Sequence, residues 1–447
     1  MNTAITLMGA GMLALSAAGW LLAVAPRMAG RLRVLISLLL LVFAASTASQ
    51  GFGVGGVGSE LPGWQQIGQL AKLLLYGAAG FSLLSLYLAP VRINWGGWNG
   101  LALYGLSLAL AGAFATVPGF AEASIYPTVV ALIGAVVVQY VRHDRLLRAI
   151  RWALFALCWG SILYWIVLPE WATSNPDALY NNLGAAYETG LLAQFGITQR
   201  WHGLIGHGNG LGYVAATALL LGLYAPARLH RLFWERAGLA AALVCLVMSQ
   251  SKTMWIATAL GYAVWALVRV ASQPPVKRAL AQVVLSAGVV AGLAAVTIYA
   301  PTLDGADLTL TGRTDIWAIT LAETQANPIG GYGPSLWDED YRNSKGEGYQ
   351  WVGQAHNQVV QTLGQSGVIG AAGLLAALLT LLDMAWRNRH LTNGASLALL
   401  TLLIVRGISE TSLRFGLDIG ALVVLTIYLV VTATPYNHTL RSPSEPA

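Results

Sequence analysis

Charged side chains are scarce in this sequence. Aspartate, glutamate, lysine and arginine make up 10% of its 447 residues, whereas hydrophobic residues make up 56%. Soluble globular domains carry about 25% charged residues, so the composition excludes an ordinary water-soluble fold. Long apolar runs recur along the chain instead, and several are close to the ~20 residues that a helix needs to cross a bilayer.

Cysteine is also rare, and nucleotide-binding fingerprints are missing. Cys158 and Cys245 lie in separate apolar runs, where we interpret them as small buried residues that form neither a disulfide nor a metal site. The sequence contains no P-loop and no Rossmann glycine fingerprint. It also has no basic arm or nucleic-acid-binding motif. We therefore expect no cofactor and no nucleic-acid partner.

The apolar runs predict an all-α, polytopic membrane protein with about 12–13 spans in the lipid bilayer. Backbone groups in lipid must be hydrogen-bonded within their own segment, and these runs are too long and continuous for barrel strands. The expected spans lie near residues 4–24, 34–49, 66–88, 99–117, 124–141, 151–168, 210–226, 237–250, 253–271, 279–300, 364–383, 395–409 and 416–433.

Arginine and lysine concentrate in alternate short loops, such as "PRMAGRLR", "VRHDRLLRAIR" and "PARLHRLFWER". The positive-inside rule places such loops in the cytoplasm, so the acidic loops and the N-terminus face outward. No Lys or Arg precedes the first run, which we therefore expect to be a span rather than a cleaved signal. This topology predicts N-terminal helices (1–168), a first outer loop (169–209), central helices (210–300), a second outer loop (301–363), C-terminal helices (364–433) and a cytoplasmic tail (434–447).

The two long outer loops collect the unusual residues. They are rich in tryptophan, tyrosine and glycine, which favours ordered loops with short helices of their own. Of the seven histidines, His202, His207 and His356 lie in or beside these loops, and the others fall on the cytoplasmic side. The polar residues therefore gather on the outer face.

The second outer loop predicts two helices with cations at their starts. "GRTDIWAITLAETQANP" predicts a helix that begins near Arg313 and ends at Pro328. "QAHNQVVQTLGQSGVIG" predicts a helix with His356 in its first turn, and Gly364 and Gly367 allow close packing or a bend. A cation at a helix N-terminus is unfavourable unless an anion is near, so both placements indicate a ligand that carries phosphate.

The first outer loop also contains polar residues that could bind such a ligand. "QRWHGLIGHGNGLG" holds Arg200, His207 and Asn209 just before a span. Its glycines let the backbone approach either a ligand or another helix closely. In "MSQSKTMW", Lys252 lies at the outer end of a helical hairpin, where it either binds a ligand or extends to the membrane interface.

We expect most of the acidic residues to have structural rather than functional roles. Asp338, Glu339 and Asp340 are consecutive, so their side chains point in different directions, and we expect a solvated loop rather than a metal site. Arg406 and Glu410 lie four residues apart near the outer end of a span, where they can pair on one helix face. The alternative for that pair is contact with a ligand.

Taken together, five motifs resemble the signature of the O-antigen ligase/polymerase superfamily. They are "RWHGLIGHGNGLG", "SQSKTMW", "GRTDIW", "NPIGGYG" and "HNQVVQTLGQSGVIG", in the same order, and the resemblance runs from about residue 195 to 415. It implies a bacterial inner-membrane glycosyltransferase with a GT-C-like helical fold. Such enzymes use glycans carried on undecaprenyl diphosphate, on the periplasmic side, without a metal. Many relatives have Arg where Lys252 stands, and Lys keeps the charge but loses the two-pronged phosphate contact.

The resemblance implies functional roles for Arg200, Arg313 and His356, and their chemistry agrees. There is no ATP outside the cytoplasm, so energy must arrive in an activated donor. Arginines can stabilise the charge that develops on a leaving diphosphate, and a neutral histidine can take the proton from an acceptor hydroxyl. We therefore predict direct inverting displacement by these three catalytic residues. The predicted substrate-binding residues are Lys252, Asn357, His207, Asn209, Arg406 and Glu410.

The sequence is compatible with three functions. We favour a ligase that passes the glycan to an acceptor such as lipid A-core. The same chemistry would serve a polymerase of O-antigen or exopolysaccharide that joins lipid-linked repeat units. The third possibility is a lipid-linked glycan flippase, but few charges lie deep in the spans and no internal repeat is clear.

Overall fold

The structure is a computed structural model that describes residues 96–120, 122–140, 143–167, 169–173, 200–205, 207–224, 232–271, 274, 313–346, 349, 352–413 and 419–432. All regular structure within these ranges is helical, which confirms the predicted all-α class. The expected spans near 4–24, 34–49, 66–88 and 279–300, most of the first outer loop and the tail lie outside the described residues.

The helices follow the predicted spans closely. In chain order they are α4 (Trp98–Ala111), α5 (Glu122–Tyr140), α6 (His143–Val167), α7 (Pro169–Thr173), η3 (Gly203–Ile205), α9 (Gly208–Gly222), α10 (Phe233–Met248), α11 (Lys252–Ala271), α14 (Arg313–Ala326), α15 (Glu339–Lys345), α16 (Gln358–Arg387), α17 (Ala395–Ser409) and α18 (Ile419–Val431).

Several of these helices are suited to a bilayer. In the part of the chain that the structure describes, three are long and apolar enough to cross a membrane: Ile150–Val167 within α6, α11 and α16. The shorter α4 and α17 are also apolar. Along α16, Leu375 and Leu379 are exposed, as expected of side chains that face lipid. The protein is therefore a helical polytopic membrane protein.

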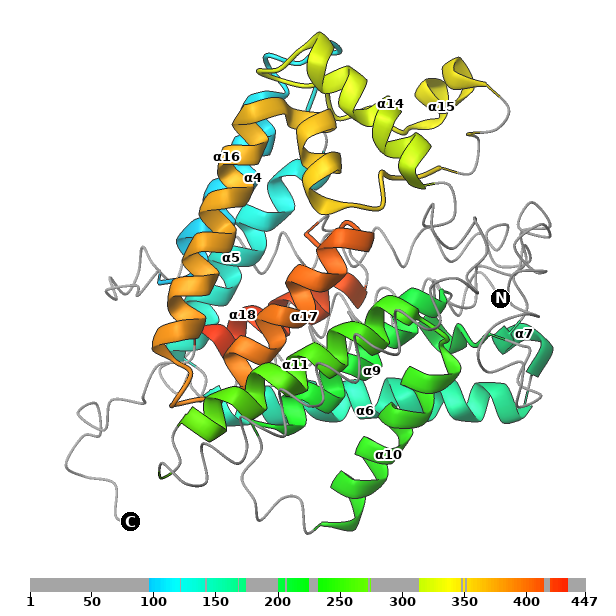
Figure 1. Cartoon of the computed structure of the whole chain (residues 1–447), viewed down its shortest axis with the longest axis vertical. Helices are drawn as coiled ribbons and strands as arrows, with labels where there is room; N and C mark the ends of the chain where they lie inside the picture. Colours follow the sequence, from blue (N-terminus) through cyan, green and yellow to red (C-terminus); the bar gives the residue numbers. More distant parts are fainter. Residues whose placement is uncertain are drawn as a thin grey trace, which may run out of the picture.

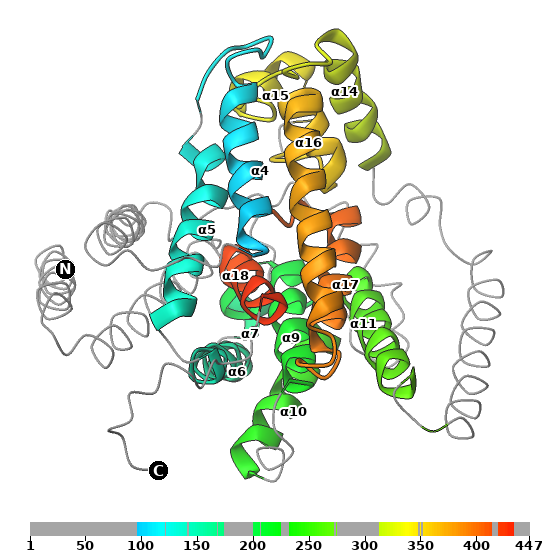
Figure 2. The same ribbon diagram turned by 90° about the vertical axis from the view of Figure 1, so that its left-hand side faces the viewer.

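The bundle has one large apolar core to which most of the membrane helices contribute. Helices α4, α5 and α16 lie side by side (Figure 2), and α11 packs along α17. Between α6 and α10, the Arg151 guanidinium donates to the Glu235 carboxylate at 2.7 Å, with both side chains almost fully buried. A pair in such surroundings is costly to break, because the remaining charge would lose its partner.

Of the two possibilities expected for the glycines after His356, close packing or a bend, Gly367 provides a bend. Gly367 has φ +55° and ψ −152°, so α16 breaks there into two segments. The segment "NPIGGYG" lies against the break: Val368 N–H donates to the Pro328 carbonyl at 2.8 Å, and Tyr332 N–H donates to the Gly364 carbonyl at 2.8 Å. A Cβ on Gly330 would lie 2.3 Å from the backbone of Phe114, which explains the glycine there. The motif thus fixes the N-terminal part of α16.

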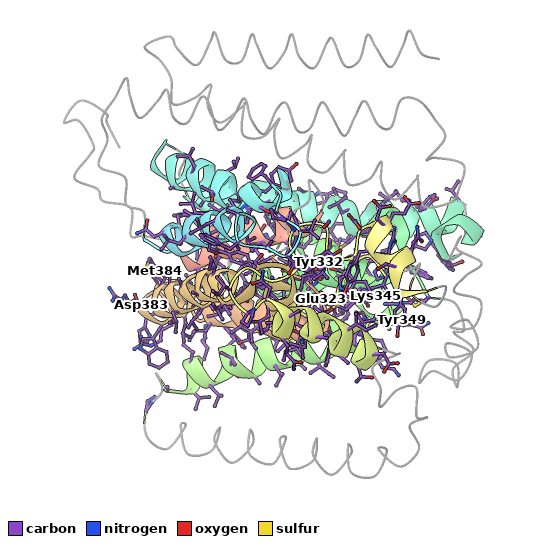
Figure 3. The ribbon with its side chains drawn as sticks, turned by 90° about the horizontal axis from the view of Figure 1, so that it is seen from above. Glu323, Tyr332, Lys345, Tyr349, Asp383 and Met384 are labelled. Atoms are coloured by element: carbon purple, nitrogen blue, oxygen red, sulfur yellow. The ribbon has the colours of Figure 1, made fainter. Side chains whose placement is uncertain are left out.

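The described part of the second long loop forms a small module of its own. Helices α14 and α15 lie at one end of the α4–α16 pair (Figure 1), over a separate apolar cluster that includes Ile316 and Trp337. Glu323 accepts hydrogen bonds from the Tyr341 hydroxyl at 2.8 Å and from Lys345 at 2.9 Å. Figure 3 shows Glu323 and Lys345 well apart from Asp383, near the other end of α16. The predicted ordered loop is therefore confirmed for its described residues.

Candidate active site

Arg200 is held between the start of α9 and the turn that joins α10 to α11. Its Nε donates to the Ser249 carbonyl at 2.7 Å, and its Nη2 donates to the Asn209 side-chain oxygen at 2.5 Å. The Ser251 hydroxyl donates to the same oxygen at 3.0 Å. A Cβ on Gly208 would lie 2.3 Å from Arg200 Nε. Glycine at this position therefore makes room for the arginine.

Glu410 joins the two long loops. Its Oε1 accepts from Asn209 Nδ2 at 2.8 Å and from Arg313 Nη2 at 3.3 Å. Its Oε2 accepts from Gln354 Nε2 at 3.2 Å and lies 3.2 Å from His356 Nδ1. The Glu410 side chain is 6% exposed. One buried carboxylate therefore brings together residues from α9, α14 and the segment before α16.

The same groups keep Glu410 ionised. Burial acts to raise the pKa of its carboxyl group, but the hydrogen bond with His356 and the positive charges around the carboxylate, including those of Arg406 and Arg313, outweigh burial. The pKa therefore lies well below the ordinary range of a glutamate. An ionised carboxylate can only accept hydrogen bonds, so its contact with His356 requires a proton on Nδ1.

Arg313 is the first residue of α14, as predicted, and it also reaches the end of α17. Its Nη1 donates to the Ser409 carbonyl at 2.5 Å, while its Nη2 contacts Glu410. The C-terminal end of α17 lies below α14 in Figure 1. An arginine at this position satisfies a carbonyl that the helix end leaves open, and it keeps further N–H groups for a ligand.

His356 lies outside the helix that follows it, so its predicted place in the first helical turn is wrong. The helix begins at Gln358 with Asn357 as its N-cap, and His356 precedes the cap with φ +51°. Such a backbone is uncommon for a non-glycine residue and is often found at functional sites. Asn357 follows directly as the cap, and His356 Nδ1 lies 3.2 Å from Glu410.

Asn357 has a structural use that was not predicted. Its side-chain oxygen accepts from the Val359 and Val360 N–H groups at 2.9 and 3.1 Å, as an N-cap residue does. Its Nδ2 donates to the Ile408 carbonyl at 3.1 Å. These contacts fix the start of α16 against the end of α17.

Arg406 and Glu410 do not pair along one helix face. Helix α17 ends at Ser409, and Glu410 has extended backbone angles. The Glu410 carboxylate forms its ion pairs with Arg313 and His356. The Arg406 guanidinium lies instead over the ring of Tyr213, with 4.0 Å from Cζ to the ring centroid. The i,i+4 pairing rule fails here because it requires the helix to continue.

Two other predicted residues adjoin this cluster in the sequence. His207 caps α9 by accepting from Asn209 N–H at 3.1 Å. Lys252 is exposed and begins α11, directly after Ser251. His202 is buried, with its Nδ1 3.1 Å from the Gly203 carbonyl.

The three consecutive acids are exposed, as predicted, but they begin a helix rather than lying in an irregular loop. Asp338 is the N-cap of α15 and accepts from Tyr341 N–H at 2.9 Å, while Glu339 and Asp340 occupy the first turn. Acidic residues there are favoured by the helix dipole. Within the ranges that the structure describes, no group of three His, Cys, Asp or Glu side chains is placed to hold a metal ion.

Gln354 is the residue that sequence reasoning missed. It donates to Glu410, and its own oxygen accepts from the Thr411 hydroxyl. Its position two residues before His356, in "GQAHNQ", was the available signal. The site as a whole contains a histidine, three arginines and a buried carboxylate near the ends of helices. The protein is therefore a helical membrane protein with a polar, cation-rich site.

Comparison with known proteins agrees with this description. Residues 237–375 match the sequence model of a family described as O-antigen ligase. The chain is also 32% identical over 165 residues to the exopolysaccharide production protein ExoQ of Rhizobium meliloti (strain 1021), a match that covers 32% of this chain and 36% of that protein. The chain therefore aligns with about a third of its relative's length. These matches confirm the resemblance to the O-antigen ligase-related superfamily.

The family match covers only part of the site. It includes Lys252, Arg313 and His356 but ends before Arg406 and Glu410, and it begins after Arg200. The hydrogen bonds of Glu410 bind these separate parts of the chain into one cluster.

Proposed function

We propose that the protein is a membrane glycosyltransferase that uses a glycan on undecaprenyl diphosphate as donor, with its active site at Glu410 and the residues around it. The single observation that supports this most is the contact of 3.2 Å between His356 Nδ1 and the Glu410 carboxylate. With its proton on Nδ1, a neutral imidazole presents a free lone pair on Nε2. That atom is then the base for an acceptor hydroxyl.

The proposed step is a direct displacement at the anomeric carbon. The acceptor oxygen forms a bond to that carbon while the bond from carbon to the diphosphate oxygen breaks. His356 Nε2 takes the hydroxyl proton, and the diphosphate leaves with the bonding electron pair. The remaining N–H groups of Arg200 and Arg313 stabilise the charge that develops on the leaving group. Attack from the face opposite the leaving group inverts the anomeric centre.

Arginine thus performs the role that a metal ion has in many phosphoryl-activated transfers. We accordingly propose that the reaction needs no metal, and that a chelator of divalent cations leaves turnover unchanged.

Charge placement supports a site on the periplasmic side of the bacterial inner membrane. Arg387 and Arg389 lie at the end of α16 remote from His356, and Arg269 lies at the end of α11 remote from Lys252. The positive-inside rule assigns that basic end to the cytoplasm. The donor's isoprenoid tail would remain in the bilayer while its glycan faces the periplasm.

We propose ligase-type transfer to an acceptor such as lipid A-core as the first candidate, since the family match is to O-antigen ligase. The name of the relative, an exopolysaccharide production protein, favours polymerisation of lipid-linked repeat units as the second. Both use the same site and differ in the acceptor.

Reconstitution in proteoliposomes with radiolabelled lipid-linked glycan would test the proposal. We expect label to move to a lipid A-core acceptor, or to lengthen into a ladder of repeat units if the protein is a polymerase. Label that crosses the bilayer without a new glycosidic product would identify a flippase and refute the transferase.

A further inference from the structure

Arg406 differs from the other two arginines of the site. Arg200 and Arg313 each donate to a backbone carbonyl and to a side chain of the cluster. The Arg406 guanidinium has no hydrogen-bond acceptor among the described residues, and its Nε is buried without one. Its face lies on Tyr213, a residue with no exposed surface. Stacking on the ring fixes the plane of the guanidinium. The N–H donors point outward in that plane, where they can bind another group.

The stacked pair lies deeper in the bundle than Glu410. Tyr213 follows Asn209 by four residues on α9, and Arg406 precedes Glu410 by four residues at the end of α17. Four residues correspond to about one helical turn, or ~6 Å. Asn209 and Glu410 meet at the outer ends of their helices, so Arg406 and Tyr213 meet one turn further toward the membrane interior.

Arg406 belongs to the same site, because Tyr213, on which it stacks, lies one helical turn after Asn209, and the Asn209 amide donates to Glu410. Arg313 contacts the Glu410 carboxylate, Arg200 contacts its hydrogen-bond partner Asn209, and Arg406 lies one turn deeper. The three arginines outnumber the one carboxylate, which leaves an excess of positive charge. A diphosphate would compensate that excess, and its two phosphates differ in depth: one carries the sugar, and the other carries the lipid tail that enters the bilayer.

We propose that Arg406, stacked on Tyr213, binds the phosphate next to the lipid tail of an isoprenoid diphosphate donor. This inference rests on the proposed function and adds a division of labour to it. Arg406 holds the donor at the membrane side, while Arg200 and Arg313 act on the phosphate next to the sugar, where the bond breaks. Guanidinium suits this role because two parallel N–H groups match two phosphate oxygens.

Binding of undecaprenyl diphosphate and undecaprenyl monophosphate to the purified protein in nanodiscs would test the proposal. The monophosphate retains only the phosphate next to the lipid. We expect Arg406→Gln to weaken binding of both lipids by about 10–100-fold, the value of a hydrogen bond to a charged group. Arg313→Gln should weaken binding of the diphosphate far more than binding of the monophosphate. Arg389→Gln is the matched control: this arginine stacks on Trp386 at 4.3 Å in the loop at the far end of α16, and its replacement should change neither affinity.

Arg406→Lys retains the charge beside Glu410. This variant replaces Arg406→Gln in the binding experiment if the melting temperature shows that the glutamine variant does not fold. We expect lysine to restore binding only in part, because it lacks the planar fork. Wild-type affinity for both lipids in a folded Arg406→Gln variant would overturn the inference. So would absence of diphosphate binding by the wild-type protein. Binding that depends on Arg406 in a protein that forms no glycosidic product would uphold this inference and overturn the proposed function.

Discussion

Replacing Glu410 with glutamine should stop transfer although the side chain keeps its shape. Glu410 accepts four hydrogen bonds, two on each carboxylate oxygen. In Glu410→Gln, one oxygen becomes an NH2 group, which donates rather than accepts. If that group faces His356, the imidazole must turn Nδ1 into an acceptor and place its proton on Nε2. The histidine then cannot take a proton from the acceptor hydroxyl.

The size of the effect follows from these contacts. Loss of the base should lower turnover by about 10²–10⁴-fold, the usual contribution of general-base catalysis. The Arg313 side chain is 17% exposed and would lose its ion-pair partner. Breaking a buried ion pair costs about 3–5 kcal/mol of stability. The loss of stability in Glu410→Gln should lie toward or below the lower end of this range, because Arg313 keeps its hydrogen bond to the Ser409 carbonyl.

Glycan transfer by the reconstituted variant, with its melting temperature measured in parallel, would test this prediction. Asp383→Asn is the matched control, because Asp383 pairs with Arg387 at 2.8 Å on an exposed part of α16. An exposed pair of this kind contributes little, so the control should keep full turnover and stability. Wild-type turnover in the folded Glu410→Gln variant would refute the role of Glu410 in positioning the base.

Two further predictions follow from the same structure. Arg200→Ala or Arg313→Ala should abolish transfer at normal protein levels, with poor rescue by lysine; an active alanine variant in a transfer assay would remove that arginine from the site. Glu235→Ala should destabilise the bundle by about 3–5 kcal/mol, because it leaves Arg151 buried without a partner; an unchanged melting temperature in detergent would contradict this.

Glu410 should also contribute to stability in a manner that depends on pH. Its pKa is lower in the folded protein than an ordinary value of about 4.3. Its contribution is therefore complete above that ordinary value and is lost as pH falls toward the folded pKa. The Glu410→Gln variant lacks this titration, so its loss of stability on acidification should be shallower than that of the wild type.

Much of the fold could be predicted from composition and periodicity alone. A bilayer demands long apolar helices, and the expected spans 253–271 and 395–409 agree with α11 and α17 within a residue or two. Gly367 was expected to permit a bend and does so. Local rules succeed where neighbours in sequence determine the outcome.

The centre of the site could not be predicted in the same way. Glu410 lies 54 residues from His356 and 97 from Arg313, so its partners depend on how distant elements pack. The local rule for residues four apart favoured Arg406 as partner, but the helix ends one residue before Glu410. The cap role of Asn357 was within reach, because asparagine is among the preferred N-cap residues.

The most direct test of the proposed function is turnover of His356 variants, measured together with donor binding. His356→Asn suits the backbone better than alanine does, because asparagine tolerates a positive φ, and its amide can still donate to Glu410. We predict that His356→Asn and His356→Ala bind undecaprenyl diphosphate like the wild type but transfer glycan about 10²–10⁴-fold more slowly. His202→Ala and His207→Ala should cost much less. Wild-type turnover in either folded His356 variant would contradict the assignment of His356 as the base.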